Sequence, residues 1–182
     1  MIIGITGTNG AGKGTVVDYL RDHKGFAHFS ARTFIVEEIE ARGLQANRDT
    51  MREVANDVRK NHGPAFVIES LFAKAIARGG NAVIESVRTI GEAEFLKSCG
   101  AHIWAVDADR KTRYERITLR GSVTDHISFE TFCAQEDREL SGTEKYDMNV
   151  AGVMAMADAT LLNNGTQEEL FAQVEVVLQQ VA

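Results

Sequence analysis

The stretch GITGTNGAGKGT, from Gly4 to Thr15, decides the fold that this chain is expected to adopt. Within it the spacing G-x-x-x-x-G-K falls at Gly7, Gly12 and Lys13. An apolar run precedes the stretch and a run with helical spacing follows it, so a strand, a glycine-rich turn and a helix are expected in that order. Glycines let successive N–H groups turn inward around an anion, while the helix dipole and a lysine add positive charge. The pattern predicts a loop that holds the phosphates of a nucleotide.

The rest of the chain predicts an α/β fold, namely a doubly wound five-stranded parallel sheet. Parallel strands joined by right-handed helical crossovers carry their binding sites at the carboxyl ends of the strands. Short β-rich runs, each followed by a stretch with helical spacing, lie at Met1–Thr6, Phe26–Phe29, Asn81–Glu85, His102–Val106 and Ala159–Leu162. Capping boxes are expected at Thr50 with Glu53, Thr89 with Glu92, and Thr166 with Glu169.

Two long helical stretches interrupt this alternation, at about residues 32–78 and about residues 109–145. Inserts on a nucleotide-binding sheet are where acceptor sites and closing lids are built. We expect the first insert to bind an acceptor, and the second to form a lid and the helix after it.

Composition narrows the classes of function. With 182 residues, 44% of them hydrophobic and 25% charged, the chain has the mixture of a globular protein, and one domain over residues 1–182 is expected. No apolar run could span a bilayer, and the start lacks the basic segment of a signal peptide, so we expect a cytoplasmic protein without a membrane partner. Two widely spaced cysteines fit reduced thiols. The net charge of −6 argues against a nucleic-acid polymer as partner. A monomer or a homodimer is expected.

The phosphate loop ends in GKGT, with Gly14 between Lys13 and Thr15, whereas most such loops place Ser or Thr directly after the lysine. This ending is typical of adenylate kinases. The chain resembles the P-loop nucleoside monophosphate kinase family over nearly its whole length, in particular an archaeal-type adenylate-kinase-like branch often compared with dephospho-CoA kinases. The resemblance implies ATP and Mg²⁺ as cofactors. It places the following residues around ATP: Gly7, Asn9, Gly10, Ala11, Gly12, Lys13, Gly14 and Thr15.

The segment ESVRT, Glu85 to Thr89, stands where these kinases have D-G-x-P-R or D-G-x-R. The resemblance implies that Arg88 is catalytic and holds the acceptor phosphate. It also implies that Glu85, in place of the aspartate, holds a magnesium-bound water together with Thr15. Glu85 is expected to contact the acceptor as well. Arg32, just beyond the second strand, is expected to bind the acceptor from a position near that of an adenylate-kinase arginine.

The segment ERITLR, Glu115 to Arg120, resembles the start of the lid in these kinases. The resemblance implies that Arg116 packs on the adenine of ATP and that Arg120 reaches the phosphates as a catalytic residue. Arg138 is expected either to move toward the phosphates when the lid closes or to pair with a neighbouring glutamate, Glu136 or Glu139. In the segment NNGT after the last strand, the residues expected to lie against the base are Asn164 and Gly165.

Five further basic residues receive no firm role from the sequence. Arg110, Lys111 and Arg113 are expected at the surface, because a run of charge on a helix is most often a solvated face. Arg52 and Arg59 lie seven residues apart, hence on one face of the first insert's helix. For these two, solubilising charge and contact with the substrate are equally supported.

The class of acceptor depends on whether arginines or a carboxylate base are present. A phosphate acceptor is already anionic and needs arginines, whereas a sugar hydroxyl needs a base. The segment Ser30 to Phe34 offers Arg32, and no acid occurs before Glu37, which favours a nucleoside or deoxynucleoside monophosphate. Transfer to a sugar hydroxyl, as in dephospho-CoA kinases, is the alternative, because Glu85 could act as the base. A regulatory ATPase without a small-molecule acceptor is a third hypothesis, whereas the N-K-x-D of a GTPase is absent from the sequence.

Overall fold

The structure is a computed structural model that describes residues 1–121 and 127–181. It contains one parallel sheet with the strand order β2-β3-β1-β4-β5. The strands are β1 (Ile2–Gly7), β2 (Ala27–Ser30), β3 (Ala82–Glu85), β4 (His102–Asp107) and β5 (Ala159–Leu162). Each lies within one residue, at both ends, of the run that the sequence predicts. The predicted five-stranded parallel sheet is therefore confirmed.

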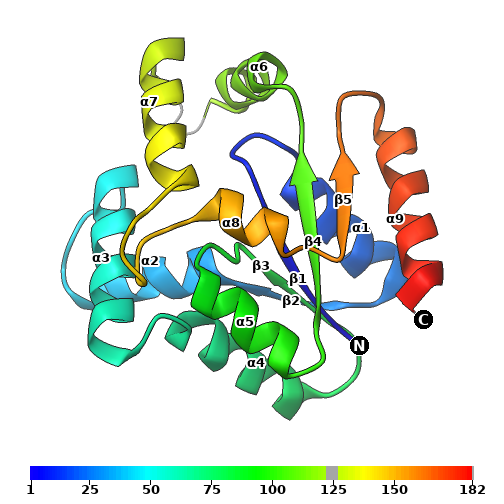
Figure 1. Ribbon diagram of the computed structural model, residues 1–182, viewed down its shortest axis with the longest axis horizontal. Coiled ribbons are helices and arrows are strands. Elements are labelled where there is room, and N and C mark those ends of the chain that lie inside the picture. Colours follow the sequence, from blue (N-terminus) through cyan, green and yellow to red (C-terminus); the bar gives the residue numbers. More distant parts are fainter. Residues whose placement is uncertain (122–126, 182) are drawn as a thin grey trace.

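Helices cover both faces of the sheet, as a doubly wound fold requires (Figure 1). The described helices are α1 (Lys13–Lys24), α2 (Ala31–Ala41), α3 (Arg48–His62), α4 (Phe66–Arg78), α5 (Ile90–Ser98), α6 (Arg110–Arg120), α7 (Phe129–Leu140), α8 (Val150–Ala155) and α9 (Gln167–Val181). None of them is long and apolar enough to cross a membrane. The insert expected at residues 32–78 holds α2, α3 and α4, and the one expected at residues 109–145 holds α6 and α7.

Two apolar cores hold these layers together. On one face α1 and α9 pack against the fully buried Trp104 of β4 through residues such as Leu20 and Val174. On the other face α2 to α5 and α8 pack on Ile84 and Ile103. Nearly all of these side chains are withdrawn from water, which is the main favourable term in folding. The cores fix the carboxyl edge of the sheet, where the turns after the strands lie.

Two of the three predicted capping boxes are confirmed. Thr89 and Glu92 exchange side-chain to backbone hydrogen bonds at the start of α5, and Thr166 and Glu169 do the same at the start of α9.

The box predicted at Thr50 with Glu53 is wrong. α3 begins earlier, and Asn47 is its N-cap. The Asn47 Oδ1 atom accepts from the backbone N–H groups of Asp49 and Thr50, both at 3.0 Å. The hydroxyl of Thr50 accepts from the Asn47 N–H at 2.9 Å, so threonine supplies the second half of the box instead of the first. Asparagine is at least as good an N-cap as threonine, and the earlier start adds a turn of helix.

Candidate active site

The glycine-rich loop joins β1 to α1 at the carboxyl edge of the sheet. Gly12 is the N-cap of α1 and has a left-handed backbone with φ of 96°. A Cβ atom at Gly12 would lie 2.3 Å from Nδ2 of Asn163, which is buried and donates to the Ala11 carbonyl at 2.8 Å. Gly12 therefore lets the loop pack against the end of β5. The first turn of α1 has open space beside it, since a Cβ atom at Gly14 would meet nothing within 4 Å.

Lys13 is folded back over this loop. Its Nζ donates to the carbonyl oxygens of Gly7 at 3.0 Å and Thr8 at 2.7 Å. Burial and the positive charge of Arg88 lower the pKa of Lys13 to about 7, although Glu85 and other nearby carboxylates oppose the shift. The lysine charge is thus poorly compensated in this conformation, and a bound anion would stabilise it.

Glu85 ends β3 and forms a hydrogen bond with a residue that the sequence analysis did not single out. His28 of β2 approaches it with 3.1 Å between Nε2 and Oε2. Burial disfavours the charged carboxylate, but the His28 hydrogen bond and the charges of Lys13 and Arg88 outweigh it, so the pKa of Glu85 lies below its ordinary value. Glu85 is therefore ionised at neutral pH, and carboxylate and hydroxyl oxygens are ligands that suit Mg²⁺. Glu85 and the half-buried Thr15 fit the metal role that the sequence predicts.

The turn after β3 carries a strained residue. Ser86 has a φ of 76°, the one positive value outside glycine in the described part of the chain. It stands where the resembling family has a glycine, and its N–H donates to the Ile5 carbonyl at 3.0 Å. Positive φ is costly for a residue with a Cβ atom and is concentrated at binding sites, where the surroundings enforce it. The strain lies two residues before Arg88, on the wall of the pocket described next.

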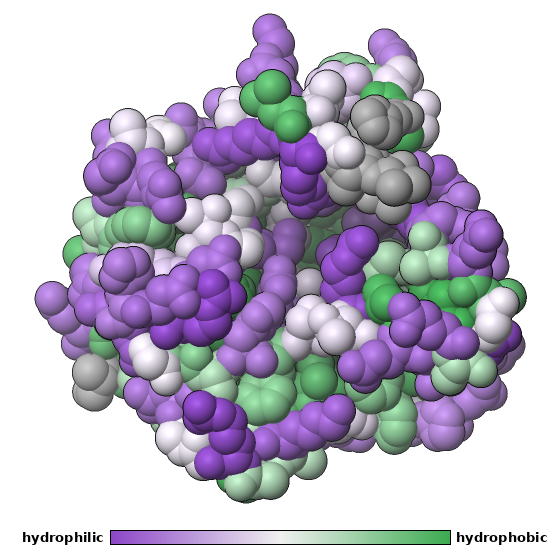
Figure 2. All heavy atoms as spheres, turned by 180° about the vertical axis from the view of Figure 1, so that it is seen from behind, coloured by the Kyte–Doolittle hydropathy of each residue, from purple (hydrophilic) through white to green (hydrophobic). Residues whose placement is uncertain are grey.

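A pocket that is partly open to solvent lies beside the phosphate loop, with Asn9 on its wall. The face shown in Figure 2 is hollowed near its centre, and mainly hydrophilic side chains surround the hollow. Glu139 is the one acidic side chain among the described residues that line the pocket. Its arginines come from four separate segments and are Arg32, Arg48, Arg52, Arg59, Arg88 and Arg120. The structure thus brings together Arg32, Arg88 and Arg120, which the sequence predicts near the phosphates, and adds Arg48, which it missed.

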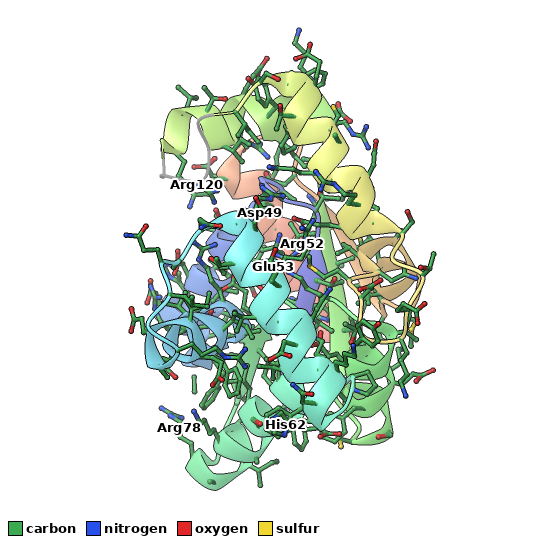
Figure 3. The ribbon with its side chains drawn as sticks, turned by 90° about the vertical axis from the view of Figure 1, so that its left-hand side faces the viewer. Asp49, Arg52, Glu53, His62, Arg78 and Arg120 are labelled. Carbon is green, nitrogen blue, oxygen red and sulfur yellow. The ribbon has the colours of Figure 1, made fainter. Side chains whose placement is uncertain are left out.

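Arg120 and Arg52 approach the same pocket from different helices. Figure 3 shows Arg120, the last residue of α6, near the first turns of α3, where Asp49 and Arg52 lie. Of the two interpretations left open for Arg52 and Arg59, position in the pocket favours contact with a ligand. Arg52 also faces Asp49 at 3.6 Å.

Glu139 of α7 joins two of these arginines. Its carboxylate lies 2.7 Å from Nη2 of Arg48 and 3.5 Å from Nη1 of Arg88. The sequence analysis names Glu139 only as a possible ion-pair partner of its neighbour Arg138. Consecutive helical residues point about 100° apart, so the two side chains face different ways. Glu139 thereby ties α7 to α3 and to the turn after β3.

Arg138 lies away from the pocket walls. It is exposed, and its Nε donates to the Ala134 carbonyl at 3.2 Å within its own helix. The expected alternative, an ion pair with Glu136 or Glu139, is wrong, because those carboxylates bind other arginines. Its movement toward the phosphates on lid closure stays a prediction.

Arg116 of α6 contacts the loop after β5. Nη1 of Arg116 donates to the Asn163 carbonyl at 2.8 Å. Asn164 is exposed and accepts from the Asp109 N–H at 2.8 Å, and Gly165 follows it at the surface. The loop after β5 thus contacts α6 at Arg116 and the residue before α6 at Asp109. Asn163 supports both the phosphate loop and Arg116. The contact of Arg116, Asn164 and Gly165 with a base stays a prediction.

The expectation that Arg113 lies at the surface is wrong. Arg113 is 4% exposed and forms a two-pronged ion pair with Glu136 of α7. It also donates to the carbonyl oxygens of Ala108 at 2.7 Å and Asn9 at 3.2 Å, so it connects both inserted helices to the phosphate loop. The reason lies in a partner 23 residues away that local spacing does not reveal. Arg110 and Lys111 do lie on the outer side, and Arg110 pairs with Glu136 and Asp137.

Removing the Arg113 charge should destabilise the protein far more than removing the Arg110 charge. Arg113→Met leaves Glu136 buried with only an exposed partner, and breaking a buried pair from one side costs about 3 kcal/mol. Arg110→Met, the matched control, removes a pair whose arginine side chain is 40% exposed, and should cost less than about 1 kcal/mol. Urea unfolding monitored by circular dichroism measures both. Equal losses would contradict the central position of Arg113.

The lowered pKa of Lys13 predicts a pH dependence of stability without ligand. In the unfolded chain Lys13 titrates near its ordinary value of 10.5, whereas in the folded protein it titrates at about 7. Between these values the unfolded state binds more protons, so stability relative to Lys13→Met should rise with pH from about 7, by at most roughly 1 kcal/mol per pH unit. Urea unfolding of both proteins at about pH 7, 8 and 9 measures the difference. Parallel pH profiles would contradict the lowered pKa of Lys13.

Comparison with known proteins shows the family of this chain. Residues 3–141 match a family model described as an AAA domain. A UPF0200 protein of Pyrococcus horikoshii is 32% identical over 188 residues, which cover 100% of this chain and 97% of that protein. A UPF0200 protein of Thermococcus kodakarensis is 29% identical over 188 residues, covering 100% of this chain and 98% of that protein.

Two solved structures share the fold at low sequence identity. TT1252 of Thermus thermophilus has a TM-score of 0.68 at 20% identity, covering 100% of this chain and 98% of that one. Shikimate kinase of Bacteroides thetaiotaomicron has a TM-score of 0.63 at 13% identity with the same coverage. These likenesses show the fold, which is the α/β fold of the P-loop NTPases. The chain belongs to the family described by the AAA domain model and, among more similar relatives, to the UPF0200 proteins.

Proposed function

We propose that this protein is an ATP-dependent phosphotransferase, which moves the γ-phosphoryl group of MgATP to a nucleoside or deoxynucleoside monophosphate. The observation that carries the proposal is the arginine-lined pocket beside the glycine-rich loop. Phosphoryl transfer asks a protein mainly to place two oxygens in line and to neutralise charge. The glycine-rich loop suits the phosphates of the donor. The arginine-lined pocket beside it suits an anionic acceptor.

On the donor side, the loop amides and Lys13 would bind the phosphates of ATP. Lys13 would exchange its two carbonyl contacts for phosphate oxygens and gain the negative charge that its surroundings lack. Arg116 with Asn164 and Gly165 would hold the adenine. Thr15 and the ionised Glu85 would hold Mg²⁺, largely through water, and the bound ion would neutralise charge on the phosphates.

On the acceptor side, the charges match one phosphate group. Arg48 and Arg88 share a single carboxylate, that of Glu139. Arg32 also lines the pocket and makes no ion pair within the part of the chain that the structure describes. These groups together leave two positive charges uncompensated, and a phosphate monoester carries nearly two negative charges at neutral pH. Arg32 and Arg88 would seat it, with Arg120 closing over the reacting phosphates.

Transfer to a sugar hydroxyl is the second candidate function, because of one observation. Glu85 is ionised, lies within electrostatic reach of Lys13 and is held by His28. A carboxylate so placed can take the proton of a hydroxyl acceptor. The arginines of the pocket favour the phosphate acceptor, since a hydroxyl has no charge for them to bind.

A coupled assay of ADP release, run with nucleoside monophosphates, deoxynucleoside monophosphates and dephospho-CoA, tests the proposal. At least one monophosphate should stimulate release to a rate on the order of 1 s⁻¹ or faster. Lys13→Ala should lose orders of magnitude of that rate and keep its circular dichroism spectrum, because the lysine contacts the transferring group. Stimulation by dephospho-CoA alone would favour the second candidate. ADP release that no acceptor changes would indicate a regulatory ATPase.

Arg88→Ala should weaken binding of the acceptor and leave the affinity for ATP nearly unchanged. Arg88 lines the acceptor pocket, and its loss removes a charge-assisted contact with the acceptor phosphate that is worth roughly tenfold or more in binding. Calorimetric titration with ATP and with the preferred monophosphate separates the two sites. Arg78→Ala, at the far end of α4 in Figure 3, is the control for removing an arginine and should change neither affinity. A larger loss of ATP affinity than of acceptor affinity would place Arg88 on the donor side.

A further inference from the structure

One face of α3 forms a wall of the pocket and gives it two different ends. The residues on this face are Arg48, Met51, Arg52, Ala55 and Arg59. From Arg48 to Arg59 the helix axis advances roughly 16 Å. Arg48 stands at the end where Glu139 and Arg88 lie. The wall between the two arginines includes the apolar side chains of Met51 and Ala55, and Ile35 of α2 adds another.

Arg59 marks the other end and is held there by a buried carboxylate. Arg59 is 3% exposed and Glu92 is fully buried, with 2.8 Å between Nε and Oε1. The other oxygen of Glu92 accepts from the backbone N–H groups of Arg88 at 2.7 Å and Thr89 at 3.1 Å. Glu92 thus fixes the arginine against the turn after β3, so the guanidinium cannot move without disturbing the start of α5.

The guanidinium of Arg59 keeps one hydrogen-bond donor that the described residues do not satisfy. Nη1 of Arg59 is buried and has no hydrogen-bond partner in residues 1–121 and 127–181. A buried donor without a partner is unfavourable, and native structures seldom keep one without a reason. Because Arg59 lines the pocket, a ligand in the pocket is the partner that would satisfy it.

The charge at this end selects the kind of ligand group. Glu92 neutralises Arg59, so the site offers a hydrogen-bond donor without a net positive charge. It differs in this respect from the Glu139 end, where arginines outnumber the carboxylate. A neutral acceptor such as a ring carbonyl oxygen therefore suits Arg59 better than a second phosphate, and the apolar wall suits a flat ring.

We infer that Arg59 binds the base of the acceptor nucleotide and that this base carries a ring carbonyl, as guanine, uracil and thymine do. The inference rests on the proposed function, which places the acceptor phosphate at the Glu139 end. A guanidinium has hydrogen-bond donors and no acceptor. It can bind the carbonyl oxygen of these bases, whereas adenine has only ring nitrogens as acceptors, and its amino group finds no partner on a guanidinium. AMP is therefore the disfavoured acceptor.

Specificity constants for GMP, UMP, dTMP and AMP test the inference. The best of the three carbonyl-bearing nucleotides should exceed AMP by at least about tenfold in kcat/KM, the size expected for one hydrogen bond to a charged group. Arg59→Lys keeps a cation for Glu92 but loses the Nη1 donor, so it should reduce this ratio toward one. Arg42→Lys, at a paired arginine outside the pocket lining, is the matched control and should keep the ratio.

A second variant keeps the test valid if Arg59→Lys does not fold, since disturbing one partner of a buried pair is destabilising. The double variant Arg59→Met with Glu92→Gln removes both charges together, and thermal unfolding reports whether each variant is folded. The inference is overturned if AMP equals the best carbonyl-bearing nucleotide in kcat/KM, or if a folded Arg59 variant keeps the wild-type ratio. If wild-type protein uses no nucleotide as acceptor, the proposed function fails. Calorimetric binding of GMP and AMP then decides the base site alone, with tighter binding of GMP supporting it and equal binding refuting it.

Discussion

The rest of the site depends on how Gly12 begins α1. Its left-handed backbone lets the loop pack on Asn163 without a side chain in the way, and the amino end of α1 is left facing the carboxyl edge of the sheet. Parallel strands bring the turns after β1, β3, β4 and β5 to that one edge. An anion bound at this helix end therefore meets groups from four separate turns, which is the physical basis of ligand binding in doubly wound sheets.

Charge is distributed in the site in two distinct ways. At the Glu139 end of the pocket, Arg48 and Arg88 share one carboxylate. Beside it, burial and then the charge of Arg88 lower the pKa of Lys13. Arg113 with Glu136, and Arg59 with Glu92, are instead buried pairs in which each cation has its own carboxylate. The first arrangement leaves positive charge for phosphates. The second holds segments in place, and in the case of Arg59, which lines the pocket, it also leaves the Nη1 donor without a hydrogen-bond partner in the described part of the chain.

The sequence predicted what is local and missed what is long-range. The strands, the phosphate loop and two capping boxes follow from patterns within a few residues, and each is found where expected. The predicted N-cap of α3, Thr50, lies three residues after the observed one, Asn47, because both residue types suit the N-cap position. Local spacing gave no means to pair Arg113 with Glu136 or Arg59 with Glu92, since these partners are 23 and 33 residues apart. Arg48 and Glu139, which are 91 residues apart, went unnoticed for the same reason.

Phosphorus NMR of a mixture of MgATP, nucleoside monophosphates and the protein tests the proposed phosphoryl transfer most directly, because it shows where the γ-phosphoryl group goes. The account predicts that ADP and a second nucleoside diphosphate form in equal amounts, with little inorganic phosphate, because the pocket beside the glycine-rich loop holds an acceptor in place of water. ADP and inorganic phosphate in equal amounts, whichever monophosphate is present, would contradict it.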